Sequence, residues 1–311
     1  MTVLLNVIAP VFAVAALGYA AAKFRLLREE GVNGLVLFVF NFAIPVLLFR
    51  SLATIELPER IPWSFLVAFY SGSAAVYALG MAAGRFLFGR PLDQAAIFGM
   101  SAAFCNTVFI GIPIILTAFG PEAALPMFLI IATHSAMGVP PTLGFIQASR
   151  GAGFAASEQA RAVLLAIAAN PIVVGLALGM AVNLAGLAIP APVDRAAELL
   201  GASAVPCALF AMGASLTQFR LAGEARAAVV LATLKLVVHP AIVWAVGSLA
   251  LGLDGTWLAV AVVMASMPTG VNAYVFGARY GAAEGVAAGT VLLASVASVA
   301  TISAILLAFG V

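Results

Sequence analysis

Charged residues are scarce in this chain. Only 8% of its 311 residues are Asp, Glu, Lys or Arg, and the mean hydropathy is +1.18. A soluble domain carries about a quarter charged residues, so too little polar sequence remains here to cover a water-facing surface. The composition predicts an integral membrane protein. Its long, unbroken apolar runs indicate helices rather than barrel strands.

Acidic residues are missing from the middle of every long apolar run. This absence disfavours a proton relay or a sodium site built from carboxylates. A sodium site built from backbone carbonyls stays open, because unwound backbone supplies such ligands in transporters.

Motifs of enzymes and pumps are absent as well. The chain has no His-Glu-x-x-His, no Gly-x-Ser-x-Gly, no mid-span pair of aspartates and no ATP-binding motif. We therefore expect no enzyme activity, no cofactor and no metal. The two cysteines, Cys105 and Cys207, lie in apolar runs and are expected to be buried free thiols. The net charge of +2 gives no basic patch for nucleic acid.

Ten apolar runs are long enough for transmembrane helices, which need about 20 residues each. The predicted spans lie near 3–23, 32–53, 63–87, 94–119, 123–148, 161–184, 193–218, 227–251, 256–278 and 285–309. The first span begins almost at Met1 without a charged leader, so we interpret it as a retained helix rather than a signal peptide.

Lys and Arg are distributed unevenly over the connections between these spans. The odd-numbered connections hold Lys23, Arg25, Arg28, Arg85, Arg90, Arg150, Arg161, Arg220, Arg226 and Arg279. The even-numbered connections hold Arg50, Arg60 and Arg195. Because cytoplasmic connections are enriched in Lys and Arg, the odd-numbered ones are predicted to be cytoplasmic, which places both termini outside the cytoplasm.

The two halves of the chain, 1–150 and 151–311, resemble each other. The matched segments are PVFAVAALG (10–18) with PIVVGLALG (171–179), PVLLF (45–49) with PCALF (206–210), CNTVFIGIP (105–113) with MPTGVNAYV (267–275), and AFGPE ending at Glu122 with RYGAAE ending at Glu284. All four occur in the same order. Because each repeat has five predicted spans, an odd number, the second repeat is expected to be inverted, as in many secondary transporters.

The fourth span of each repeat contains glycine, proline and polar residues at its middle. Proline and glycine can break a helix into two halves joined by an unwound link, and matched breaks in two repeats indicate a substrate site at mid-membrane. The predicted substrate-binding residues are Asn106, Thr107, Gly111, Ile112, Pro113, Thr269, Gly270, Asn272, Ala273 and Tyr274.

The chemistry of such breaks favours an anionic ligand. Inverted symmetry brings both half-helix N-termini toward the centre, where free N–H groups and the helix dipole attract an anion. Asn106 and Asn272 would add amide donors. The alternative is a pair of proline kinks whose Asn side chains bond neighbouring helices.

The segments NTVFIGIP (106–113) and MPTGVNAYVFGARYG (267–281) resemble the two crossover motifs of the auxin efflux carrier family, and KLVVHP (235–240) resembles a pattern in its eighth span. The resemblance covers nearly the whole chain. It implies ten spans, crossed broken helices in spans four and nine, and a bacterial inner membrane protein that transports small organic anions such as malonate or malate.

The resemblance also implies a scaffold of spans 1, 2, 6 and 7, a transport domain of spans 3–5 and 8–10, and a homodimer. Plant members carry a proline at the ninth-span crossing, where this chain has Ala273 after Asn272. They also carry a long cytoplasmic loop, which is absent between Arg150 and Arg161. Auxin is therefore not the expected substrate.

Three further residues are candidates for support or coupling. Lys235 is the one cation well inside a predicted span, where it supports the anion site or the crossover, or else extends toward the membrane surface. His239, four residues later, shares its helix face and either assists Lys235 or bonds backbone opened by Pro240. His134 is a proton carrier or makes a structural bond between helices.

The sequence as a whole predicts a secondary carrier of small carboxylates that works by elevator-like alternating access. The alternatives are a sodium-coupled organic anion symporter and a channel. Coupling to protons or sodium stays open, since neither is specified by the residues.

Overall fold

The computed structural model describes residues 8–151, 165, 168–220 and 223–311, and every regular element in these ranges is a helix. The beginnings of the predicted spans 3–23 and 161–184 lie outside the described residues, as does Arg161. Within the described ranges, the β-structure is limited to one isolated antiparallel bridge between Cys105 and Thr269.

The chain forms two compact units, and each unit takes segments from both halves of the sequence. The first unit comprises Met1–Ile61, Val108–Ala132 and Leu164–Gln218. The second comprises Pro62–Thr107, Thr133–Val163 and Phe219–Val311.

The first unit is built from α1 (Ala9–Lys23), α2 (Glu29–Phe38), η2 (Val39–Ala43), α3 (Ile44–Thr54), α6 (Ile112–Phe119), η5 (Pro121–Ala123), α9 (Pro171–Leu184), α10 (Ala191–Ala202), α11 (Ala204–Ser215) and η6 (Leu216–Gln218). The second is built from α4 (Ser64–Ala82), η3 (Ala83–Leu87), α5 (Leu92–Ala103), α12 (Ala225–Thr233), η7 (Leu234–Val238), α13 (His239–Trp244), η8 (Ala245–Ala250), α14 (Gly255–Ala265), α15 (Asn272–Tyr280) and α16 (Glu284–Ala308). The boundary between the units falls inside η4 (Thr107–Gly111) and α7 (Ala124–Ser149).

Six helical segments of the described chain are long and apolar enough to cross a membrane. They are Glu29–Thr54, Ser64–Leu87, Pro121–Ser149, Ala191–Gln218, Ala225–Ala250 and Glu284–Ala308. Four shorter apolar helices are Ala9–Lys23, Thr107–Phe119, Pro171–Leu184 and Gly255–Ala265. Two of these, Thr107–Phe119 and Gly255–Ala265, belong to the fourth and ninth predicted spans, which are interrupted. The ten-span inverted repeat stays a prediction.

Several prolines are accommodated by local changes of helical geometry, whereas Pro140 and Pro141 lie inside the uninterrupted helix α7. Short π-helical turns come immediately before the turns that carry Pro45, Pro113 and Pro240. Proline has no N–H and its ring clashes with the carbonyl four residues back, and a π turn relieves this conflict without ending the helix. Pro206 acts differently, because α10 ends at Ala202, four residues before it, and α11 begins after Ser203.

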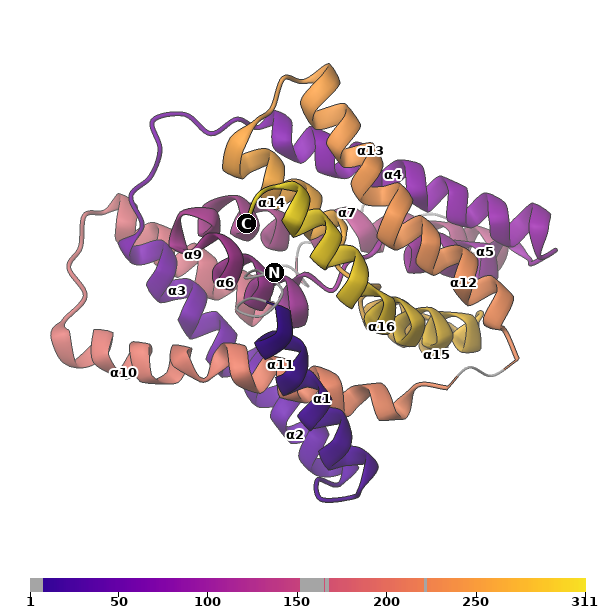
Figure 1. Ribbon diagram of the computed structural model, residues 1–311, viewed down its shortest axis with the longest axis horizontal. Coiled ribbons are helices and arrows are strands. Elements are labelled where there is room, and N and C mark those ends of the chain that lie inside the picture. Colours follow the sequence, from indigo (N-terminus) through magenta and orange to yellow (C-terminus); the bar gives the residue numbers. More distant parts are fainter. Residues whose placement is uncertain (1–7, 152–164, 166–167, 221–222) are drawn as a thin grey trace. The chain divides into compact units, whose positions relative to one another are not determined.

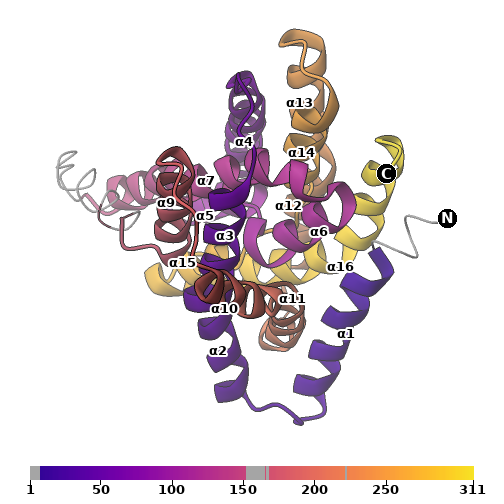
Figure 2. The same ribbon diagram turned by 90° about the vertical axis from the view of Figure 1, so that its left-hand side faces the viewer.

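In the first unit, helices from opposite halves of the chain pack against each other at glycines. α1 packs on α11 and α3 packs on α9 (Figure 1), whereas α1 and α2 are joined by the connection at residues 24–28, seen at the bottom of Figure 2. A Cβ atom added at Gly18 would lie 2.0 Å from the carbonyl oxygen of Phe210. One added at Gly179 would lie 2.4 Å from that of Phe49. Only glycine allows the two backbones to come so close.

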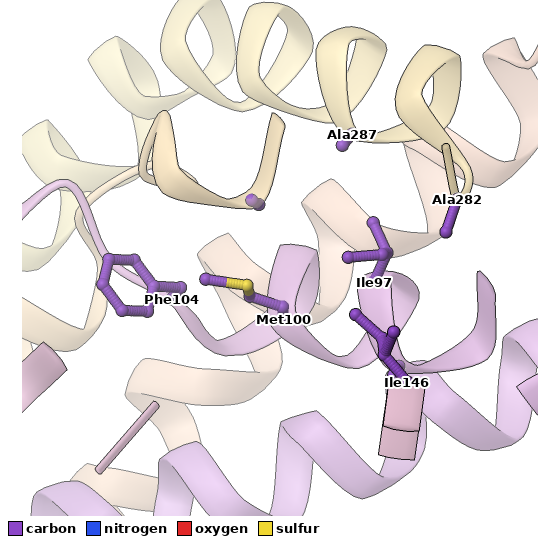
Figure 3. Packing of buried hydrophobic residues seen from close by; sticks show 8 residues of the cluster. Ile97, Met100, Phe104, Ile146, Ala282 and Ala287 are labelled. Atoms are coloured by element: carbon purple, nitrogen blue, oxygen red, sulfur yellow. The ribbon is translucent and has the colours of Figure 1, made fainter. Parts of the chain in front are cut away.

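The core of the second unit surrounds α5. This helix packs on α4, and its inner residues Ile97 and Met100 lie among Ile146 of α7 and Ala287 of α16 (Figure 3). The four residues are almost completely buried. α12 and α15 pack on α16, the yellow helix of Figure 1, and α13 packs on α4 and α14. The end of α5 is thereby fixed in a well-packed core.

Candidate functional site

The first interruption follows α5. This helix ends at Ala103, and Phe104 has an extended backbone with φ −75° and ψ 118°. Helical structure resumes only at Thr107. The residues between, Phe104 to Asn106, form an unwound link, which we call the first link.

The second interruption lies between α14 and α15. α14 ends at Ala265, and α15 begins at Asn272. Pro268 lies between them, lacks an N–H group and disfavours helical geometry in the residue before it. We call Ser266 to Val271 the second link.

The two links pair with each other through their backbones. The N–H of Asn106 donates to the carbonyl oxygen of Pro268 at 2.8 Å, and the N–H of Gly270 donates to that of Phe104 at 2.9 Å. A Cβ atom at Gly270 would lie 2.9 Å from the Phe104 ring and 3.0 Å from the Cys105 carbonyl oxygen. Backbone polar groups at membrane depth need such partners, and the pairing supplies them between segments more than 160 residues apart.

Five of the predicted site residues, in or next to the two links, are buried. Asn106, Thr107, Thr269 and Ala273 are at most 6% exposed, and Gly270 is buried. The Thr269 hydroxyl donates to the carbonyl oxygen of Ser101 at 2.7 Å. The pairing of the two links therefore brings four predicted residues together: Asn106, Thr107, Thr269 and Gly270.

The other predicted residues lie beyond the links. Asn272 is the exposed first residue of α15, and Tyr274, two residues later, is half-buried. Gly111, Ile112 and Pro113 lie at the junction of η4 and α6, in the first unit. The N-terminus of α15 has no side-chain cap, and Val271 precedes it. The N–H of Ala273 donates to the Gly270 carbonyl oxygen at 3.1 Å, whereas those of Asn272 and Tyr274 have no hydrogen-bond partner among the described residues and are available to an anion.

Lys235 holds the second link from its α14 side. Its side chain is completely buried and donates to the carbonyl oxygen of Ala265, the last residue of α14, at 2.6 Å. The C-terminus of a helix carries partial negative charge and unpaired carbonyls, so an ammonium group there compensates both. The side chain also interacts with Cys105 of the first link. Lys235 therefore does not extend toward the membrane surface.

His239 extends this network toward α4. Its Nδ1 lies 3.0 Å from Lys235 Nζ, and its Nε2 lies 3.0 Å from the Ser73 hydroxyl, which in turn donates to the Phe69 carbonyl oxygen. An ammonium donates only, so Nδ1 accepts and Nε2 carries the hydrogen donated to Ser73. The order of donation is Lys235, His239, Ser73, Phe69.

His134 holds the first link from α7. Its Nε2 accepts the N–H of Cys105 at 2.9 Å, and its ring lies 4.4 Å, centroid to centroid, from that of Phe104. Nε2 accepts, so the neutral ring carries its hydrogen on Nδ1. This is the geometry of the interhelical structural bond.

Two parts of this arrangement gave no sequence signal. The Ala265 carbonyl is a backbone group, and Ser73 lies in a span without a matched motif in the other repeat.

Both cysteines are free thiols, Cys105 buried and Cys207 half-buried. In the described residues, no group of three or more His, Cys, Asp or Glu is placed to hold a metal ion.

Comparisons with known proteins identify relatives over almost the whole chain. It is 29% identical over 306 residues to the "Putative malonate transporter" of Rhizobium meliloti, covering 98% of this chain and 96% of that protein. It is 28% identical to an "Uncharacterized transporter" of Methanothermobacter thermautotrophicus, covering 83% of each chain.

A mouse protein, the "Lysosomal cholesterol signaling protein", is 27% identical over 217 residues, and the match spans 65% of this chain but only 24% of that protein. The model of the family described as membrane transport protein matches residues 3–306. The chain therefore belongs to this family of membrane transport proteins, the auxin efflux carrier family.

Proposed function

We propose that this protein is a secondary carrier that moves a small organic anion across a bacterial cell membrane by alternating access. The observation that carries the proposal is the pairing of the two links, Asn106 to Pro268 and Gly270 to Phe104, beside the uncapped N-terminus of α15. An amide and free helix N–H groups bind a carboxylate without a buried arginine. Such a site binds an anion and still releases it.

The substrate class follows from the partial positive charge of the helix N-terminus, which favours an anion, and from the relatives. The relative named as a malonate transporter matches along almost its full length, which favours malonate or a similar dicarboxylate such as malate. We propose a second contact to the carboxylate from Asn106, with Thr107 and Thr269 shaping the site.

The arrangement of ten spans in two inverted repeats is part of the proposal. Gly18 and Gly179 are matched positions of the sequence repeat, and so are Phe210 and Phe49. Gly18 packs on the Phe210 carbonyl and Gly179 on the Phe49 carbonyl. This exchange of matched partners is what a two-fold axis between inverted repeats produces.

The elevator motion is proposed from the division into units. The first unit contains the predicted scaffold spans 1, 2, 6 and 7, and the second contains spans 3, 8, 9 and 10. Residues 108–132 depart from the expected grouping, because their contacts assign them to the first unit. We propose that the second unit, which carries both links, moves as the transport domain. We also propose a homodimer with both termini outside the cytoplasm.

Uptake into proteoliposomes tests the function. Radiolabelled malonate, malate, acetate and a neutral analogue, malonamide, are offered with imposed proton, sodium and voltage gradients. We expect saturable malonate or malate uptake that internal unlabelled substrate accelerates. Flux that neither saturates nor responds to internal substrate would indicate a channel and overturn the proposal.

The gradients separate the coupling alternatives in the same assay. Uptake that requires external sodium would establish the sodium-coupled symporter, for which unwound backbone supplies carbonyl ligands.

Asn106→Ala is measured beside Asn33→Ala, a control in which an exposed asparagine of α2 is changed. Equal rates in the two variants would place the binding site elsewhere.

A further inference from the structure

The second unit contains a cavity that is separate from the uncapped end of α15. Its volume is about 330 Å³, at the small end for ligand sites, and α4, α5, the first link and α7 line it. Most of its wall is aromatic or thioether side chains, including Tyr77, Phe104, Phe145, Met100 and Met137. Three polar groups of known hydrogen-bond direction, Ser73, Tyr77 and His134, share this wall.

Ser73 offers only a lone pair to the cavity. Its hydroxyl hydrogen is donated to the Phe69 carbonyl oxygen at 3.0 Å. Its oxygen accepts from His239 Nε2 at 3.0 Å. A hydroxyl has one hydrogen and two lone pairs, so a ligand at Ser73 has to be a donor.

Tyr77 likewise offers only a lone pair to the cavity. The Thr142 hydroxyl donates to the Gly138 carbonyl oxygen at 3.2 Å, so its oxygen accepts the hydrogen of Tyr77 at 3.1 Å. The Tyr77 oxygen keeps a lone pair and has no hydrogen left to give.

His134 is the third polar residue of this wall. Its Nε2 accepts the Cys105 N–H, so the hydrogen is on Nδ1. Nδ1 is buried and has no hydrogen-bond partner in the described part of the chain. The residue is 4% exposed. Because this nitrogen is fully buried, a ligand in the cavity does not reach its hydrogen.

A hydroxyl group fits the accessible polar atoms of this wall. It donates its one hydrogen to the oxygen of Ser73 or to that of Tyr77. A carboxylate has acceptors only and would face the lone pairs of Ser73 and Tyr77. An ammonium has donors only and would be desolvated among apolar walls.

The Phe104 ring separates this cavity from the second link. A Cβ atom at Gly270 would lie 2.9 Å from one edge of the ring, and one at Gly138 would lie 2.8 Å from the other. The ring thus fills the space between the α14–α15 link and α7. A ligand in the cavity contacts Phe104 and His134 from the side away from the second link.

We propose that this cavity is a second binding site, for a neutral, mainly apolar molecule that carries a hydroxyl group, such as an aliphatic alcohol. It is distinct from the anion site. Its ligand packs against Phe104, a residue of the first link, and against His134, which bonds that link, so occupancy stiffens the link.

Photolabelling in proteoliposomes tests the proposal with a defined probe. The probe is 1-octanol with a diazirine near the end of the chain, and labelled positions are mapped by mass spectrometry. We expect labelling of α7 near Met137 and Phe145. Competition by 1-octanol should be strong, that by octyl methyl ether, which cannot donate, at least fivefold weaker, and that by octanoate absent.

Two matched variants locate the label. Ala74 is exposed on α4 and lines the cavity, whereas Ala78, one turn along, is exposed and does not line it. Ala74→Trp should reduce labelling at least tenfold, and Ala78→Trp should leave it unchanged. Malonate transport should persist in both variants.

Several outcomes would overturn the proposal. Competition by octanoate as strong as by octanol would refute the selectivity for a neutral hydroxyl. Labelling unaffected by Ala74→Trp would place the probe in the surrounding lipid. Displacement by malonate would make the cavity part of the transport site. The first two results do not depend on whether malonate is the transported anion, because labelling is read without transport.

Discussion

The Lys235 ammonium donates to the carbonyl oxygen of Ala265, at the end of α14, from a helix thirty residues earlier in the chain. The contact is completely buried. It places a positive charge on the negative end of the half-helix that leads into the second link. Lys235 is thereby a positioning residue for the second link, which connects Ala265 to the helix N-terminus proposed to bind the anion.

Replacing Lys235 tests this positioning role. Lys235→Ala should weaken malonate affinity at least tenfold, which corresponds to about 1.4 kcal/mol, because the Ala265 carbonyl and His239 Nδ1 both lose a donor. Lys235→Arg should keep part of the affinity, since the charge stays and the geometry changes. The measurement is the concentration dependence of uptake by purified, monodisperse protein.

Lys23→Ala is the matched control, because Lys23 is exposed at the end of α1. Its affinity should equal that of the wild type. Wild-type affinity in Lys235→Ala would show that the second link keeps its geometry without the ammonium.

Asn106 is predicted to contact the substrate carboxylate. A hydrogen bond to a charged group contributes roughly 1.5–3 kcal/mol, so Asn106→Ala should lower affinity by roughly tenfold to a hundredfold. Asn106→Asp should lower it further, because a carboxylate repels the anion. Asn272→Ala should have a smaller effect, since the Asn272 side chain is exposed at the start of α15. Binding of malonate by calorimetry measures all three.

The order of these effects is itself informative. An Asn272→Ala variant that loses more affinity than Asn106→Ala would shift the anion site from the first link to the N-terminus of α15.

The glycine contacts of the first unit predict matched losses of stability. Gly18→Ala and Gly179→Ala each place a Cβ atom within 2.4 Å of a carbonyl oxygen on the facing helix. Overpacking of this kind costs about 1–3 kcal/mol. Both variants should therefore melt at lower temperature in detergent, by similar amounts. Gly34→Ala, where a Cβ atom meets nothing within 4 Å, should not. A loss in only one of the two would contradict the proposed two-fold relation.

Thiol labelling tests the predicted orientation. Leu26 and Glu59 are exposed in the first and second connections. In a Cys207→Ala background, Leu26→Cys should react with an impermeant maleimide only after right-side-out vesicles are opened. Glu59→Cys should react in sealed vesicles. The reverse pattern would invert the proposed topology. Buried Cys105 should stay unlabelled throughout.

The sequence by itself determined the membrane class, the family and the positions of the interruptions. These are local properties. Hydrophobicity summed over about 20 residues decides whether a segment spans a membrane, and the glycines and prolines around Asn106 and Pro268 decide where a helix can break. The structure has helical breaks at 104–106 and 266–271, inside the two predicted spans.

Only the tertiary structure decided which groups meet at those interruptions. Lys235 meets the Ala265 carbonyl, His134 meets the Cys105 N–H, and the two links pair through Phe104, Asn106, Pro268 and Gly270. Most of these partners are backbone groups, which every residue carries, so no pattern of side chains announces them. The exposure of Asn272, the burial of Thr269 and the hydrogen bonds of Ser73 arise in the same way, because they depend on helices that are distant in sequence and close in space.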